Sequence, residues 1–140
     1  MSEPLVFNFD VDGENFTSAG EASVTMKKNL RMLGMKPDII RRVAIAMYEG
    51  EINMVIHAGG GKAAVTVYPE RIEIVLDDNG PGIADVELAM KEGFSTAPEN
   101  IRSLGFGAGM GLPNMKKNTD TMVIESALGV GTKITMTVNT

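Results

Sequence analysis

Apolar and polar residues alternate at the start of the chain. Over residues 5–10, the apolar Leu5, Phe7 and Phe9 are separated by Val6, Asn8 and Asp10. A period of two is typical of a β-strand with one buried face. The sequence therefore predicts a first strand here, which ends at the turn formed by Asp12 and Gly13.

A first helix is expected next. Thr17 or Ser18 can cap a helix that continues to about Leu33, and Gly34 is suited to end it. A second helix is expected to begin at Pro37, because the first helical position does not need an N–H. It should continue to Ala58 with one buried stripe of apolar residues at helical spacing, namely Ile40, Val43, Met47 and Met54.

The rest of the chain contains two predicted hairpins. The expected elements are strands at Ala63–Tyr68 and Ile72–Leu76, a short helix at Val86–Glu92, a loop at Gly93–Gly107, a helix beginning within Gly109–Lys117, and strands at Met122–Ser126 and Lys133–Val138. Strands and helices do not alternate regularly, which argues against a doubly wound parallel sheet. The fold class predicted is α+β, a two-layer sandwich with helices on one face of a mixed, mostly antiparallel sheet.

Composition narrows the range of functions. The 140 residues predict one domain, and a hydrophobic content of 44% predicts a folded one. The net charge of −5 argues against a general nucleic-acid binder. The absence of cysteine excludes disulfides and thiolate metal sites. No apolar run approaches the roughly 20 residues of a membrane helix, and no signal peptide is evident, so a cytoplasmic protein is expected.

Two residues of the second helix are candidates for chemistry. Glu49 and Asn53 are four positions apart and so share a helix face among apolar neighbours. The amide oxygen of Asn53 is a hard ligand that suits Mg²⁺, and Glu49 could serve as a base. An isolated pair of this kind is more often a solvated flank. Glu51, two positions from Glu49, should point elsewhere and lie at the surface.

A first glycine cluster follows a predicted strand. The run L-D-D-N-G-P-G-I extends from Leu76 to Ile83 and includes Asp78. A carboxylate leaving a strand could accept the exocyclic amine of adenine, and glycine lets the backbone pass close to a flat base. Ordinary turn chemistry explains the same residues, so the motif alone is moderately specific.

A second glycine cluster, G-F-G-A-G-M-G-L, extends from Gly105 to Leu112 and precedes a predicted helix. Free backbone N–H groups and a helix N-terminus form an anion site, for which phosphate is the obvious ligand. Neither the dinucleotide fingerprint nor the P-loop motif fits. Arg102 and Lys116 are candidate phosphate contacts, although solvated charges are equally consistent. For His57, a position facing the helix C-terminal dipole is the favoured interpretation.

The combination is far more specific than its parts. E-x-x-x-N on a helix, D-x-G-x-G after a strand, G-x-G-x-G before a helix and Gly131-Thr132 opening the last strand resemble the Bergerat-fold (GHKL) ATPases, across roughly residues 40–138. That superfamily includes gyrase, heat-shock chaperone, histidine kinase and mismatch-repair proteins. The words D-D-N-G-P-G-I, G-F-S-T and G-A-G-M-G-L-P most resemble the small anti-sigma-factor serine/threonine kinases of the stressosome switch type.

The resemblance implies a role for each motif. Asn53 would ligate Mg²⁺, Glu49 would be the catalytic base, Asp78 would contact adenine, and residues 93–104 would form a lid over ATP. The cofactor-binding set implied is Asn53, Asp78, Gly80, Gly82, Arg102, Gly105, Gly107, Gly109, Met110, Gly111, Leu112 and Thr132.

The presence of Glu49 separates branches of this superfamily. A serine or threonine hydroxyl must lose a proton when it is phosphorylated, so a carboxylate base helps, whereas an imidazole acceptor needs none. The expectation is an ATP- and Mg²⁺-dependent serine/threonine kinase that phosphorylates a protein antagonist and binds a sigma-factor-type regulator. Homodimers are expected from the same resemblance, and nucleic-acid and membrane partners are not. The alternative is an ATP-binding interaction module with little or no phosphotransfer.

Overall fold

The computed structural model describes residues 4–12, 20–82 and 111–140. The elements in chain order are β1 (Leu5–Asp12), α1 (Glu21–Met32), α2 (Pro37–Asn53), the π-helical η2 (Met54–Ala58), β2 (Gly60–Val67), β3 (Arg71–Asp78), α5 (Gly111–Lys117), β4 (Thr121–Ala127) and β5 (Gly131–Asn139). The short helix, the loop and the lid expected between residues 86 and 107 lie outside the described residues.

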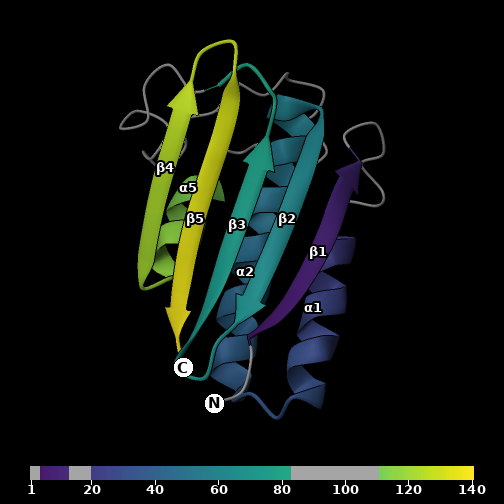
Figure 1. The fold of residues 1–140 in the computed structure, drawn as a ribbon, viewed down its shortest axis with the longest axis vertical. Coiled ribbons are helices and arrows are strands. Elements are labelled where there is room, and N and C mark those ends of the chain that lie inside the picture. Colours follow the sequence, from purple (N-terminus) through teal and green to yellow (C-terminus); the bar gives the residue numbers. More distant parts are fainter. Residues whose placement is uncertain (1–3, 13–19, 83–110) are drawn as a thin grey trace.

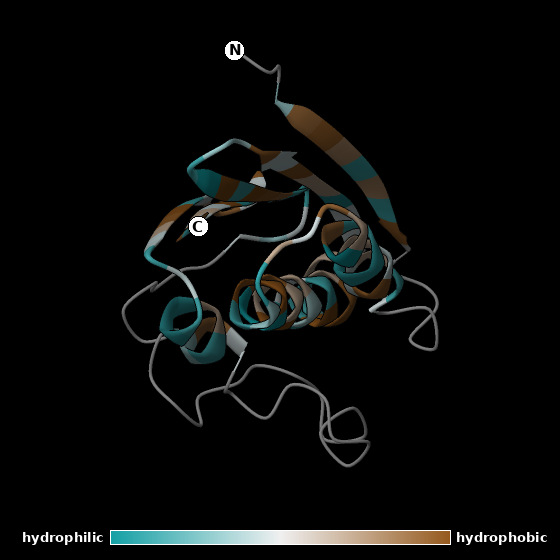
Figure 2. Ribbon diagram, turned by 90° about the horizontal axis from the view of Figure 1, so that it is seen from below, coloured by the Kyte–Doolittle hydropathy of each residue, from teal (hydrophilic) through white to brown (hydrophobic). Residues whose placement is uncertain are grey.

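The strands form one sheet in the order β1-β2-β3-β5-β4, and the described helices lie together on one of its faces (Figures 1 and 2). This confirms the predicted α+β sandwich. All four strand pairings between the described strands are antiparallel, so the sheet is more uniform than the mixed sheet expected. None of the described helices is both long and apolar enough to cross a membrane.

The core lies between the sheet and the two long helices. Val65, Ile74 and Met136 are opposite one another on β2, β3 and β5, and all three are fully buried. They belong to one apolar cluster with the stripe predicted for the second helix. That stripe is buried throughout and consists of Ile40, Val43 and Met47 on α2 and Met54 at the start of η2. The apolar residues at helical spacing and those at strand spacing in the sequence therefore pack into a single core.

A glycine brings α2 unusually close to the sheet. A Cβ atom on Gly50 would collide with the Cδ1 atom of Leu76 in β3. Only a residue without a side chain allows this approach. The contact sets the C-terminal half of α2, which carries Glu49 and Asn53, beside the end of β3, which carries Asp78.

The start of α1 differs from the prediction. The helix begins at Glu21 with Gly20 as its N-cap residue at φ 99°, so the expected cap at Thr17 or Ser18 is wrong. Those two residues themselves lie outside the described part of the chain. Gly20 has no side chain to accept the free N–H groups of the first turn, and another element must supply the acceptor.

That acceptor is Glu51. Its Oε2 atom accepts the N–H of Gly20 at 2.6 Å, and its Oε1 atom accepts the N–H of Ser23 at 2.7 Å. Glu51 is 2% exposed, so its expected place at the surface is wrong. The helical geometry correctly turned it away from Glu49, but α1 covers the face to which it points.

Candidate functional site

The last turn of α2 passes directly into the π-helix η2. Asn53 is the final residue of α2. η2 is followed by its C-cap residue Gly59, which has a left-handed backbone with φ 72°. Single π-helical turns are frequent at functional sites. A Cβ atom on Gly80 would lie only 2.6 Å from the Cβ atom of Ala58. The first glycine cluster therefore packs tightly against the end of η2.

Asp78 is held in a fixed orientation at the end of β3. Its Oδ1 atom accepts the N–H of Gly80 at 2.9 Å and that of Thr132 at 3.2 Å. Thr132 is the partner of Asp78 in the β3–β5 register. The Oδ2 atom accepts no hydrogen bond from the described residues. The carboxylate is thus oriented by two backbone donors and retains one oxygen for a ligand.

A pair of hydroxyl groups lies beside this carboxylate. The Oγ atom of Ser126 and the Oγ1 atom of Thr132 are 2.9 Å apart, and the two residues face each other across β4 and β5. Thr132 was among the predicted residues, but Ser126 was not. The expected final hairpin contained the signal, because its register determines which residue faces Thr132.

Glycines allow three segments to converge at Asp78. A Cβ atom on Gly131, which has φ 143°, would collide with the carbonyl oxygen of Asp78. One on Gly82, which has φ 82°, would collide with the carbonyl oxygen of Ala127. The β4–β5 turn is also joined to the first glycine cluster by a hydrogen bond from the N–H of Gly129 to the carbonyl of Pro81, at 2.9 Å.

The start of α5 lies against the other two candidate residues. A Cβ atom on Gly111 would be 3.0 Å from both polar atoms of the Asn53 amide. The Nδ2 atom of Asn114 is 3.5 Å from the Oε1 atom of Glu49, at the outer limit of a hydrogen bond. The fold thus brings Gly111, the last glycine of the second glycine cluster, to Asn53, and Asn114 to Glu49. Asn114 was not predicted, and its position three residues after Gly111, on the predicted helix, was the available signal.

Three other residues considered in the sequence analysis lie in the described part of the chain, and five candidate residues do not. The side chain of Leu112 is buried in the apolar core, and Lys116 is exposed. His57 lies in the last turn of η2, where burial lowers its pKa and favours the neutral imidazole at pH 7. The residues that lie outside the described part of the chain are Arg102, Gly105, Gly107, Gly109 and Met110.

The polar side chains of this site could hold a metal ion only if a bound ligand supplied further oxygen atoms. In residues 4–12, 20–82 and 111–140, no group of three or more His, Cys, Asp or Glu side chains could hold a metal. Asn53 contributes one amide oxygen. Mg²⁺ commonly combines one or two protein ligands with phosphate oxygens and water. The polar groups therefore fit a magnesium–nucleotide complex rather than a bare ion.

Comparison with known families agrees with this geometry. The family described as "Histidine kinase-, DNA gyrase B-, and HSP90-like ATPase" matches residues 33–140, which include every candidate residue. The match begins just before α2 and continues to the C-terminal residue.

Individual relatives extend the comparison. The chain is 33% identical over 97 residues to the serine/threonine-protein kinase RsbT of Bacillus subtilis (strain 168), with 66% of this chain and 67% of that protein covered. It is 35% identical over 103 residues to an anti-sigma F factor of Caldanaerobacter subterraneus subsp. tengcongensis, with 70% and 68% covered.

Two solved structures share the fold. The mycobacterial sensor histidine kinase MprB superposes with a TM-score of 0.55 at 18% identity, with 96% of this chain and 97% of that chain covered. A chain of the SiaB–SiaC complex from Pseudomonas aeruginosa gives 0.56 at 11% identity, with 97% and 89% covered.

Proposed function

Because this chain belongs to the family of histidine kinase-, DNA gyrase B- and HSP90-like ATPases, we propose that its site binds ATP with Mg²⁺ and phosphorylates a serine or threonine of a partner protein. It is a kinase of the anti-sigma regulatory class, as its similarity to RsbT and to anti-sigma F factors supports. In this proposal the chain acts as a single domain in the cytoplasm. It phosphorylates a protein antagonist and binds a sigma-factor-type regulator.

The observation that carries the proposal is the arrangement around Asp78. Two backbone N–H groups fix Oδ1, which leaves Oδ2 as an acceptor for the exocyclic amine of adenine. The hydroxyl groups of Ser126 and Thr132 lie alongside and can hold a water between protein and base. A guanine base would present a carbonyl oxygen to the same carboxylate, so this site favours ATP over GTP.

Asn53 and Glu49 would bind the metal ion and assist the transfer of the phosphoryl group. The Asn53 amide oxygen would ligate Mg²⁺, which offsets phosphate charge when the nucleotide is bound. Glu49 would accept the proton of the attacking serine or threonine hydroxyl, and the Asn114 amide lies where it can orient that carboxylate. Phosphoryl transfer depends mainly on positioning and electrostatic stabilisation, and the packing of α2 on β3 provides the first of these.

The test compares two neighbouring aspartates by isothermal titration calorimetry. Asp78→Asn replaces the free acceptor by a donor that faces the adenine amine. A hydrogen bond to a charged group contributes about 1.5–3 kcal/mol, so affinity for ATP and for ADP should each fall roughly 10- to 150-fold. Asp77→Asn is the matched control, because Asp77 is exposed and lies one position earlier on β3. Unchanged affinity in Asp78→Asn would remove the adenine assignment.

A further inference from the structure

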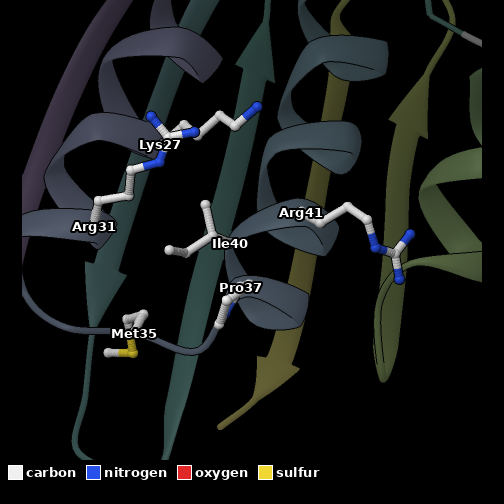
Figure 3. A pocket seen from close by; sticks show the side chains of 6 residues that line it. All are labelled: Lys27, Arg31, Met35, Pro37, Ile40 and Arg41. Atoms are coloured by element: carbon white, nitrogen blue, oxygen red, sulfur yellow. The ribbon is translucent and has the colours of Figure 1, made fainter.

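A cavity of about 240 Å³ lies between α1 and α2, at the end of α2 remote from Asn53. It is lined by Lys27, Arg31, Met35, Pro37, Ile40 and Arg41. Figure 3 shows Lys27 and Arg31 extending from α1, Ile40 and Pro37 on α2, Met35 at one end, and the guanidinium of Arg41 directed away. We call this feature the basic cleft. None of its residues belongs to the nucleotide site.

The basic cleft combines positive charge with an apolar wall. Ile40 is buried at its base, and Met35 is partly buried. The end of α1, next to Arg31 in sequence, carries further exposed apolar surface, because Met32 is 79% exposed and Leu33 is 44% exposed. A ligand that matches both features must carry an apolar group next to negative charge.

The charge here opposes that of the whole chain. Residues 27–42 contain six of the 13 basic residues but only one of the 18 acidic residues, Asp38. That acid pairs with Arg41 at 2.7 Å. Among the described residues, no acid lies within ion-pair distance of Lys27 or Arg31. These two cations are four positions apart on one helix face, where like charges repel each other mildly, so a bound anion would stabilise them.

We propose that the basic cleft docks an acidic segment of the partner protein, with an apolar side chain between carboxylates. The apolar group would fill the cavity over Ile40, and the carboxylates would pair with Lys27 and Arg31. Two cations on a chain of net charge −5 are too few to offset a nucleic-acid backbone, which favours a protein ligand. This deepens the proposed function, and rests on it only for the existence of a protein partner.

The position of the basic cleft fits such a role. Glu49 is eight positions after Arg41 on α2, or about 12 Å along the helix axis at 1.5 Å per residue. A protein anchored at the cleft could therefore present a hydroxyl near Glu49. Complementary charge at a remote anchor would mainly accelerate association and select the partner, rather than assist the chemistry.

The test measures fluorescence anisotropy of a labelled short peptide with one leucine flanked by glutamate and aspartate, in the absence of nucleotide. We expect the wild type to bind it, and to bind the glutamine–asparagine counterpart and a leucine-to-serine version more weakly. The double variant Lys27→Gln/Arg31→Gln should weaken binding of the acidic peptide about tenfold. The matched control, Lys62→Gln/Lys133→Gln, removes the same charge from exposed positions on strands β2 and β5 and should bind as the wild type does.

Each other outcome overturns the proposal. Equal loss in both double variants would show a general charge effect, and no loss in either would place the peptide elsewhere. Failure of the wild type to prefer the acidic peptide would exclude an acidic ligand. If the wild type instead binds anionic phospholipid vesicles or an oligonucleotide, and that binding depends on Lys27 and Arg31, a protein occupant of the basic cleft is excluded. ATP titrations on the same samples keep this result separate from that for Asp78.

Discussion

The carboxylate of Glu51 should contribute substantially to the stability of the fold. It accepts two backbone N–H groups of α1, from Gly20 and Ser23, across 31 and 28 residues of sequence. Replacement by alanine would leave both donors buried without an acceptor. It would also remove the contact that joins the start of α1 to the last turn of α2, the turn that bears Glu49 and Asn53.

The magnitude follows from two opposing contributions. Hydrogen bonds to a charged group contribute roughly 1.5–3 kcal/mol each, whereas burying the carboxylate has a cost of its own. Burial raises the pKa of Glu51 above its ordinary value of 4.5, and the N–H groups of Ser23 and Gly20 counter this only in part. We therefore expect a net loss of about 2–4 kcal/mol in Glu51→Ala, and about half of that in Glu51→Gln, which retains one acceptor.

The assay is urea unfolding followed by circular dichroism, with the free energy obtained by linear extrapolation. Glu125→Ala, at an exposed position of β4, is the control and should change stability by less than about 0.5 kcal/mol. If Glu51→Ala unfolds at the same urea concentration as Glu125→Ala, the buried cap contributes nothing and the reasoning fails.

The same residue predicts a dependence on pH. Because the folded state holds the proton of Glu51 more tightly than the unfolded state does, its contribution to stability is full below pH 4.5 and declines as the pH rises above that value. The difference in unfolding free energy between the wild type and Glu51→Gln should therefore shrink between about pH 4 and pH 7. A difference that grows over this range would contradict the raised pKa.

Three further predictions concern the site and the assembly. Asn53→Ala should weaken Mg²⁺-dependent ATP binding in calorimetry, while Glu49→Gln should keep the affinity but slow phosphotransfer roughly 10²- to 10⁴-fold; equal loss of binding in both would make Glu49 structural. Gly131→Ala should cost about 1–3 kcal/mol more in urea unfolding than Gly129→Ala, because both have positive φ but only Gly131 approaches the Asp78 carbonyl, and equal costs would contradict this. The chain should form dimers in sedimentation, because Leu5 and Val6 are 46% and 57% exposed on the edge strand β1, and a concentration-independent monomer would exclude this.

Periodicity and turn residues were sufficient to predict most of the fold. The stripe of α2, the alternation in β1 and the start of α2 at Pro37 all depend on neighbours in sequence, and all were predicted correctly. The cap of α1 was not, because its acceptor, Glu51, comes from another helix 31 residues away. The same limit applies to Ser126, whose pairing with Thr132 requires the register of β4 and β5.

The candidate site shows the same division between local and long-range information. The motifs predicted that Asp78 and Thr132 serve one site, and the structure joins them by a hydrogen bond. They did not reveal that Gly131 must lack a side chain to let β5 reach the Asp78 carbonyl. This requirement arises because the backbones of β3 and β5 approach each other closely in the fold. It cannot be predicted from the composition or periodicity of either segment alone.

One turn of α2 shows why the chemical residues cannot be separated from the packing around them. Successive helical residues are rotated by about 100°, so Glu49 and Asn53 share a face while Gly50 and Glu51 point to other sides. Gly50 allows contact with β3, and Glu51 binds the start of α1. Each of the three faces thus meets a different neighbour. A shift of this turn that improved one contact would disturb the other two, and the resulting constraint holds Glu49 and Asn53 in place beside Asp78.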